Sequence, residues 1–191
     1  MNQLICRPKW LVQSHADLKR HEGFRPYAYP DPLSDLGKKH GRKFGYKPAR
    51  EVLATLGEDD SLKAGPWTVG YGFTGKDVTV DTHMTEAEAD ERLYVEIMEH
   101  AQGLDKLVPN WGNAPLVAQT VLVNLIFNMG TEKLRKFTNT LKYFNAGEYA
   151  KAATNLTKSL WYQQVGSRAK ELTSRLADGL IPDRFKVNDI A

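Results

Sequence analysis

Residues 85–104, TEAEADERLYVEIMEHAQGL, contain the clearest secondary-structure signal in the chain. Thr85 and Glu88 have the spacing of a capping box, in which each side chain satisfies a free backbone donor at the start of a helix. Apolar residues then follow on one helical stripe, at Ala89, Leu93, Ile97, Ala101 and Leu104. These residues predict a helix of roughly five turns that ends before Pro109.

The sequence on either side of this helix has two different patterns. Residues 24–80 are rich in Gly, Pro and aromatic residues, and the stretch 67–73, WTVGYGF, is typical of a strand in a small β-sheet. From Ala114 onward, apolar residues repeat at helical spacing in several short segments that extend to Leu176. The sequence therefore favours an α+β fold with a small sheet and a mainly helical C-terminal half.

A shorter helix is predicted near the N-terminus, within 9–23. Ser14 is a suitable N-cap, with Asp17 three residues later, and Gly23 suits the left-handed residue that ends a helix. Glu22 is then the last helical residue. The segment from Pro182 onward has no such pattern, and we expect it to be a loosely held extension.

Composition excludes several classes of protein. The chain is 41% apolar with a formal charge of +3, which suits a globular protein and excludes a disordered or collagen-like one. The single cysteine, Cys6, excludes an internal disulfide framework. No stretch approaches the roughly 18 apolar residues of a membrane span, and Arg7, Pro8 and Lys9 interrupt any signal peptide within 1–14. We therefore expect no transmembrane segment and synthesis in the cytoplasm.

The small net charge hides an uneven distribution. Residues 77–105 contain nine acids and one base, a sum of −8, so the rest of the chain carries +11. Between positions 36 and 50 there is no acid, and six basic residues lie there: Lys38, Lys39, Arg42, Lys43, Lys47 and Arg50. Such a run is compatible either with a solvated loop or with contact to an anionic polymer or surface.

Several kinds of catalytic site are missing from the sequence. The five histidines lack carboxylate or thiol partners at metal-ligand spacing, and Arg25 stands where a zinc helix beginning at His21 needs its second histidine. There is no G-x-S-x-G motif of a serine hydrolase, and Gly70 and Gly72 lack the lysine of a phosphate-binding loop. We therefore predict no metal and no other cofactor.

Glu22 and Asp31 remain as candidates for catalysis. The C-terminal end of a helix carries partial negative charge, which favours a protonated Glu22. Asp31 lies between Pro30 and Pro32 in a loop, where we expect it to stay ionised. Glycoside hydrolysis uses such a pair of acids in contrasting environments. Many unrelated proteins also have an acid at a helix end and an aspartate in a turn, so spacing alone leaves both interpretations open.

The residues around these acids resemble those of a known family. The pattern Glu22-Gly23, then Asp31, then 68–72, TVGYG, is similar to the active-site segment of the phage-type lysozymes, the endolysins of glycoside hydrolase family 24. Further motifs follow in the order and spacing of the T-even phage lysozymes: 124–130, NLIFNMG; 137–141, FTNTL; 155–162, NLTKSLWY; and Arg168-Ala169. The resemblance covers roughly 14–179, and several motifs in one order make it specific.

The resemblance implies a role for each matching residue. Glu22 corresponds to the general acid, Asp31 to the residue that orients or activates water, and Thr68 to a residue that helps to hold that water. Arg168 corresponds to an arginine paired with the acid, which favours the ionised form of Glu22, so the net effect on Glu22 stays open. The positions that contact or border the sugar correspond to Phe127, Asn128, Asn155 and Trp161; core packing is the better expectation for the two aromatic residues.

The family also implies a fold and an activity. We expect a single lysozyme-like domain, 1–191, made of an N-terminal lobe (about 14–84, with an insertion at 32–66), a linking helix (about 85–106), a helical C-terminal lobe (about 112–179) and a tail (180–191). The active site is expected in the cleft between the two lobes. The implied reaction is hydrolysis, with inversion, of the β-1,4 bond between N-acetylmuramic acid and N-acetylglucosamine in peptidoglycan.

The implied biology is that of a phage endolysin. We expect a monomer that is made in the host cytoplasm, binds no nucleic acid, and reaches the cell wall in the periplasm through a membrane lesion made by a holin. Its basic surface is expected to speed association with the anionic wall, an effect that salt weakens.

Three departures from the family and three alternatives remain. The T-even enzymes have a short turn where 36 residues lie between Asp31 and Thr68 here, which leaves the placement of Thr68 open. Phe73 replaces a histidine, and Gly166 replaces a proline.

A lytic transglycosylase would need the acid but no water-holding pair. A wall-glycan-binding protein would have no working acid, and a nucleic-acid-binding or surface-binding protein would act through 38–50.

Overall fold

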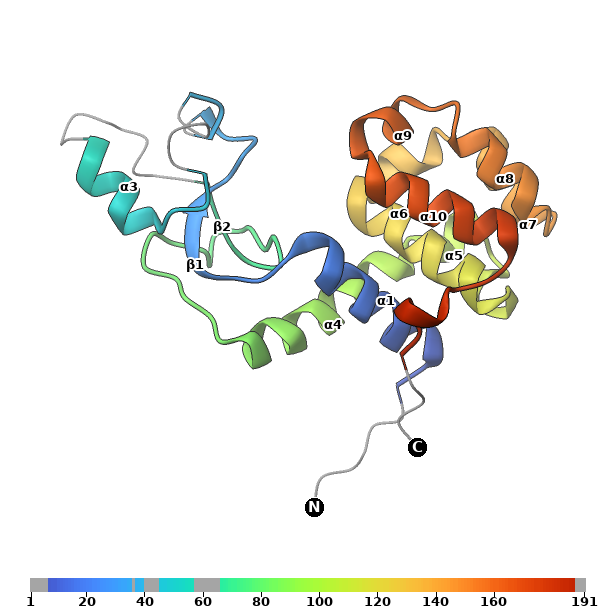
Figure 1. Cartoon of the computed structure of the whole chain (residues 1–191), viewed down its shortest axis with the longest axis horizontal. Helices are drawn as coiled ribbons and strands as arrows, with labels where there is room; N and C mark the ends of the chain where they lie inside the picture. The colour runs from blue at the N-terminus through green and yellow to red at the C-terminus, as the bar shows by residue number, and fades with distance from the viewer. Residues whose placement is uncertain (1–6, 36, 40–44, 57–65, 188–191) are drawn as a thin grey trace, which may run out of the picture. The chain divides into compact units, whose positions relative to one another are not determined.

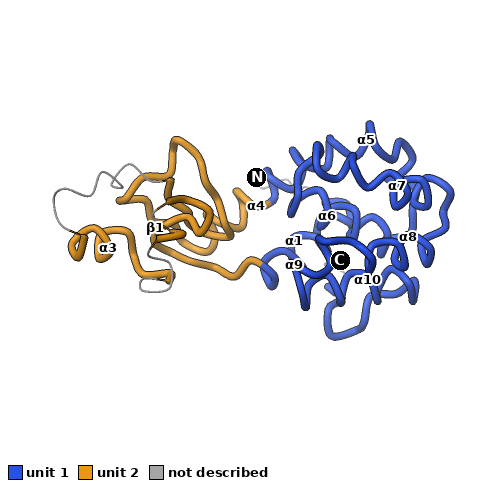
Figure 2. Tube along the Cα trace, turned by 90° about the horizontal axis from the view of Figure 1, so that it is seen from above, with its two compact units in different colours: residues 1–21, 94–191 blue, residues 22–93 orange. Residues whose placement is uncertain are grey.

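The computed structural model describes residues 7–35, 37–39, 45–56 and 66–187, and Figure 1 labels its elements. The chain forms two compact units, shown in different colours in Figure 2. Unit 2 comprises residues 22–93, and unit 1 comprises residues 1–21 with 94–191. In the described part of the chain, the elements are mostly helices with one small antiparallel sheet, which confirms the predicted α+β fold.

Unit 2 contains the two-stranded sheet. The strand β1, Arg25–Pro30, pairs with β2, Trp67–Gly70, in a register that places Tyr29 opposite Thr68. The helix α3, Ala49–Leu56, packs against β1.

The second strand is shorter than the predicted 67–73. It ends at Gly70 because the chain turns back on itself there: Val69 N donates to Phe73 O at 3.0 Å, and Phe73 N donates to Val69 O at 2.9 Å. Alternation of side chains in the sequence does not distinguish this tight turn from a continuing strand.

The helix α4, Glu86–Gln102, begins with the predicted capping box. Thr85 N donates to Glu88 Oε2 at 2.8 Å, and Glu88 N donates to Thr85 Oγ1 at 3.2 Å. The bonds from the Thr85 backbone and side chain lower the pKa of Glu88 below its usual value. The predicted apolar stripe is buried throughout, although its last member, Leu104, begins a separate short helix, α5, Leu104–Leu107.

Unit 1 is helical. Its long helix α6, Leu116–Arg135, is buried on all sides over 121–126, where every residue has no exposed surface, and it changes direction at Gly130. The helix α10, Ser167–Asp178, packs against α6, against α8, Tyr149–Leu156, and against α9, Leu160–Val165. The remaining elements are α7, Thr138–Asn145, which packs against α8, and two 3₁₀ turns, η2, Trp111–Asn113, and η3, Asp183–Phe185.

The first helix, α1, begins earlier than predicted. It spans Lys9–Glu22, and Ser14 is not its N-cap but a fully buried residue in its interior. Leu11 N and Val12 N both donate to Pro8 O, at 2.9 and 3.1 Å, so the helix starts directly after this proline. A proline suits the start of a helix because it has no backbone N–H to lose. At the other end, Gly23 has φ 70° and ends the helix as predicted.

The C-terminal segment is not loosely held, contrary to expectation. Gln13 Nε2 donates to Phe185 O at 2.7 Å, and Val187 N donates to Gln13 Oε1 at 3.1 Å. The Arg20 guanidinium lies 4.1 Å from the centre of the Phe185 ring. These contacts fix the segment up to Val187 on α1; residues 188–191 lie outside the described part of the chain.

No helix within the described residues is long and apolar enough to cross a membrane. Cys6 lies outside those residues.

Candidate active site

The sheet register in unit 2 places three polar side chains on one face. Tyr29 lies opposite Thr68, and Asp31 follows Tyr29 by two residues, so all three share a face of the pleated backbone. Asp31 N donates to Pro66 O at 3.2 Å, which continues the pairing one position past each strand. Asp31 and Thr68 are therefore diagonal neighbours on this face.

Asp31 and Thr68 are in direct contact. Thr68 Oγ1 donates to Asp31 Oδ2 at 3.2 Å, and Thr68 is only 4% exposed. Leu33 N donates to Asp31 Oδ1 at 2.7 Å, so each carboxylate oxygen accepts a hydrogen bond. The long insertion leaves the two residues together because it departs and returns at the paired positions Asp31 and Pro66.

Glu22 approaches the same unit from the end of α1. Gly23 turns the chain from the helix into β1. A methyl group on Gly72 would lie 3.9 Å from Glu22 Oε2, so the carboxylate lies beside the turn that follows β2. The residue is half-buried. All three predicted catalytic residues thus belong to unit 2.

Tyr29, which the sequence analysis did not single out, lies within the electrostatic reach of both acids. Its phenol has a pKa raised to about 12, first because the ring is buried, and then because of Tyr46, Asp31 and Glu22, against the lowering effect of Arg25. Both carboxylates therefore act electrostatically on this one phenol. The sequence does carry a signal for this role: Tyr29 precedes Asp31 by two residues at the end of a strand, so the two side chains fall on the same face.

The inserted segment adds an aromatic ring beside this face. Tyr46 packs edge-on against Tyr29, with ring centres 5.0 Å apart, and Arg25 lies 4.4 Å from the centre of the Tyr46 ring. Tyr46 is 59% exposed. The insertion therefore contributes an accessible tyrosine next to Tyr29.

The five predicted substrate-binding residues all lie in unit 1. Trp161 is buried, as expected, and its Nε1 donates to the Oδ1 of the exposed Asn128 at 2.8 Å. Asn155 Oδ1 accepts a hydrogen bond from Thr140 at 2.8 Å. Phe127 is only half-buried, and its ring packs at 5.0 Å against the His100 ring.

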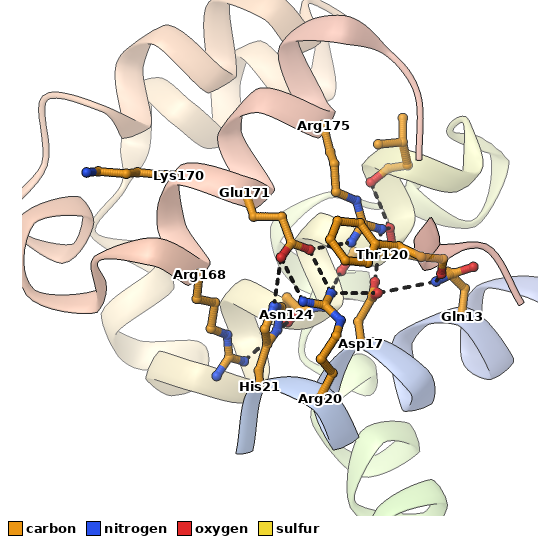
Figure 3. A network of polar contacts seen from close by, with 12 residues as sticks. Gln13, Asp17, Arg20, His21, Thr120, Asn124, Arg168, Lys170, Glu171 and Arg175 are labelled. Carbon is orange, nitrogen blue, oxygen red and sulfur yellow. Dashed lines mark hydrogen bonds and ion pairs between the residues drawn. The ribbon is translucent and has the colours of Figure 1, made fainter. Parts of the chain in front are cut away.

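Arg168, the fifth of these residues, contacts α6. Arg168 Nη2 donates to Asn124 Oδ1 at 3.2 Å, and His21 Nδ1 lies 3.3 Å from the same oxygen (Figure 3). Asn124 is fully buried, and its Nδ2 donates to Thr120 O at 3.1 Å, which fixes the orientation of the amide. The pairing of Arg168 with Glu22 would join the two units and stays a prediction.

Glu171 is the centre of the polar network in Figure 3. Its two carboxylate oxygens accept hydrogen bonds of 2.7 Å each from Arg20, and Arg175 Nη1 and His21 Nε2 lie 3.2 and 3.5 Å away. Burial raises the pKa of Glu171, but the bonds and charges of His21 and Arg20 outweigh burial and lower that pKa far below its usual value. Neither His21 nor Glu171 was predicted, because about 150 residues separate them in the chain.

A buried ion pair lies beneath Glu171. Arg175 Nη2 is 2.9 Å from Asp17 Oδ2, and both side chains are 1% exposed. This pair joins the middle of α1 to α10 inside unit 1.

Two of the departures from the family have a visible structural role. Phe73, in place of a histidine, is buried and meets the Tyr71 ring edge-on, and the Arg92 guanidinium lies 4.7 Å from its centre. Gly166, in place of a proline, has φ 67° at the junction of α9 and α10. A left-handed residue of this kind suits glycine and excludes proline.

The basic run is only partly described. Arg50 Nε pairs with Asp81 at 2.6 Å, and Lys38, Lys39 and Lys47 are exposed. Arg42 and Lys43 lie outside the described residues. Within the described part of the chain, no group of three or more His, Cys, Asp or Glu side chains is placed to hold a metal ion.

Comparison with protein families gives a match over much of the chain. The model of the phage lysozyme family matches residues 54–178, which is more than half of the chain. The match includes Thr68 and the five predicted residues of unit 1, whereas Glu22 and Asp31 precede it. Residues 32–53, the first part of the insertion, separate Asp31 from the matched region.

Curated relatives come from several phages. The chain is 31% identical over 109 residues to an endolysin of Bacillus phage B103, covering 57% of this chain and 40% of that protein. It is 30% identical over 164 residues to the pre-baseplate central spike protein Gp5 of Enterobacteria phage T4, covering 85% of this chain and 27% of Gp5. A SAR-endolysin of Bacteriophage PS119 is 27% identical over 130 residues, 68% of each chain.

The chain therefore spans less than half the length of the first two relatives. The match to the family model over more than half of its residues nevertheless shows that the chain belongs to the phage lysozyme family.

Proposed function

We propose that this protein is a peptidoglycan hydrolase, a muramidase that cleaves the β-1,4 bond between N-acetylmuramic acid and N-acetylglucosamine. The observation that carries the proposal is the Thr68–Asp31 hydrogen bond on one face of the unit 2 sheet, with Glu22 beside Gly72 in the same unit. Family membership supports the same conclusion, because phage relatives are named endolysins.

In the proposed reaction, Glu22 donates a proton to the glycosidic oxygen as the bond breaks. Asp31 accepts a hydrogen bond from an attacking water and receives its proton, while Thr68 keeps the Asp31 carboxylate in one orientation. Water then attacks the anomeric carbon on the face opposite the leaving group, so the product inverts. Each oxygen of Asp31 already accepts one hydrogen bond and keeps a second lone pair for the water.

In the proposed biology, the protein acts as an endolysin. It is made in the host cytoplasm as a monomer, and reaches the wall in the periplasm after a holin has permeabilised the membrane. Asn128, Asn155, Phe127, Trp161 and Arg168 would contact or border the glycan.

The test is hydrolysis of purified peptidoglycan by the wild-type protein and by Glu22→Gln, Asp31→Asn and Glu51→Gln. We expect both site variants to lose nearly all activity. Glu51→Gln makes the same change at an exposed position of α3 and is expected to behave as the wild type. Equal clearance by Glu22→Gln and wild type would refute the catalytic assignment of Glu22, and a wild-type protein that binds peptidoglycan without clearing it would favour a glycan-binding protein.

Product analysis separates the proposal from its enzymatic rival. Hydrolysis leaves a reducing muramic acid end, seen by mass spectrometry, and inversion makes the first-formed anomer α in proton NMR spectra. A 1,6-anhydromuramic end would instead identify a lytic transglycosylase. Retention on DNA without any lytic activity would favour the nucleic-acid-binding alternative.

A further inference from the structure

The first turn of the insertion contacts Asp31 closely. Ser34 N donates to Asp31 O at 3.0 Å, and Ser34 Oγ donates to the same oxygen at 2.6 Å. Together with the bond from Leu33 N to Asp31 Oδ1, these contacts come from residues directly after the aspartate. We call residues 31–35 with Gly37 the Ser34 turn.

The Ser34 hydroxyl links two parts of this turn. It donates to Asp31 O and accepts a hydrogen bond from Gly37 N at 2.9 Å. Ser34 is 7% exposed, so water does not readily replace these bonds. A backbone hydrogen bond also ties Ser34 to the next turn, because Lys38 N donates to Ser34 O at 2.8 Å.

Gly37 lies against the backbone of Asp31. A methyl group on Gly37 would overlap Asp31 O and would lie 2.8 Å from both Asp31 C and Pro32 Cα. Because these are backbone atoms, no side-chain rotation relieves the overlap. Any larger residue at position 37 must therefore displace Asp31 or the turn.

Every polar atom of Asp31 has a partner. Its N donates to Pro66 O, its O accepts from Ser34, Oδ1 accepts from Leu33 N, and Oδ2 accepts from Thr68. The insertion supplies all of these partners except Thr68. Because both the backbone and the two carboxylate oxygens of Asp31 are hydrogen-bonded, the carboxylate has little freedom to change its orientation.

We infer that the Ser34 turn orients the catalytic aspartate, and that Ser34 and Gly37 are positioning residues for it. The inference rests on the proposed function, in which Asp31 aims a water at the anomeric carbon. Misplacement of such a group by about 1 Å costs about 100-fold in rate. The insertion is thus part of the catalytic apparatus as well as an addition to the surface.

The sharpest test compares Ser34→Thr with Ser34→Val. The two side chains have the same shape, but only threonine keeps the hydroxyl. We expect Ser34→Val to lower kcat about 10-fold or more relative to Ser34→Thr, with KM within about twofold, because the lost contact acts on orientation rather than on sugar binding. Equal kcat values for the two variants, or a change confined to KM, would overturn the role of Ser34.

Gly37→Ala tests the close approach of Gly37 to the backbone of Asp31. We expect it to lower kcat by a similar factor, with KM again nearly unchanged. Gly112→Ala is the matched control, since a methyl group there meets no atom within 4 Å. A Gly37→Ala enzyme with wild-type kcat would show that Asp31 does not depend on the turn.

Hydrogen exchange separates this inference from the proposed function. The Leu33 amide, bonded to Asp31, is expected to exchange at least about tenfold faster in Ser34→Val than in Ser34→Thr, whether or not the protein is active. If the wild-type protein releases no reducing ends but the exchange rates differ as expected, the muramidase assignment fails and the turn still orients Asp31. If exchange is unchanged, the turn does not orient Asp31, whatever the activity.

Discussion

The Thr68 hydroxyl donates a hydrogen bond of 3.2 Å to Asp31 Oδ2, although 36 residues lie between the two. The bond forms because the insertion begins after Asp31 and ends at Pro66, its partner across the ladder, so the register of β1 and β2 is unaffected. Lengthening a loop is inexpensive once its ends are paired, since each doubling costs only about 0.6 kcal/mol in closure entropy. A long insertion is therefore compatible with close contact between the two proposed catalytic residues.

Removing the Thr68 hydroxyl is expected to impair catalysis. Thr68→Val keeps the shape of the buried side chain but leaves Asp31 Oδ2 without its donor, so we expect kcat to fall about 10- to 100-fold. Thr68→Ser, which keeps the hydroxyl, should retain most of the activity. Release of reducing ends measures both, with the exposed Thr55→Val as control. Equal loss in the valine and serine variants would assign Thr68 to packing alone.

Local signals in the sequence predicted local structure well. The capping box of Thr85 and Glu88 and the end of α1 at Gly23 depend on residues within four positions, and both are present as expected. Ser14 fits an N-cap equally well by type, but its side chain is buried inside unit 1. Residue preference alone does not distinguish a cap from a small residue in a packed helix.

Such local signals do not predict contacts between segments that are distant in the sequence. The resemblance to a family suggested that Asp31 and Thr68 act together, whereas nothing in the spacing predicts their diagonal pairing across the sheet. The bonds of Glu171 to Arg20 and of Ser34 to Asp31 O were missed for different reasons. The first joins two distant helices, and the second depends on the path of a turn inside the insertion.

Tyr46 is expected to control the titration of Tyr29. Burial and Tyr46 raise the pKa of the Tyr29 phenol to about 12, so Tyr46→Ala, which uncovers the ring, should lower that pKa toward its ordinary value of 10.0. NMR detection of the Tyr29 ring carbon that bears the hydroxyl measures the change. Tyr46→Phe keeps the covering ring and should cause a smaller shift. An unchanged Tyr29 titration in Tyr46→Ala would mean that Tyr46 does not bury it.

Glu171 is expected to make folding sensitive to acid. Its folded-state pKa is lowered, so its contribution to stability is complete above the ordinary value of 4.5 and is lost as the pH falls toward the lowered value. Glu171→Gln should therefore lower the free energy of unfolding by about 2 kcal/mol near pH 7, and by progressively less below pH ~4.5. Urea unfolding at several pH values measures the difference, with the exposed Glu132→Gln as control. A difference that does not shrink in acid would contradict the assignment.

Replacing only one partner of the buried pair Asp17–Arg175 should lower the free energy of unfolding substantially. Both side chains are 1% exposed, so Arg175→Met leaves the buried Asp17 carboxylate with the longer, 3.4 Å ion pair to Arg20, and we expect a loss of about 3–5 kcal/mol in the free energy of unfolding. Adding Asp17→Asn removes this poorly compensated charge and should recover part of the loss, although each change alone is destabilising. Lys186→Met breaks an exposed pair with Asp183 and should have no measurable effect. If the double variant is less stable than Arg175→Met by the full effect of Asp17→Asn, the two residues act independently and the pair does not couple α1 to α10.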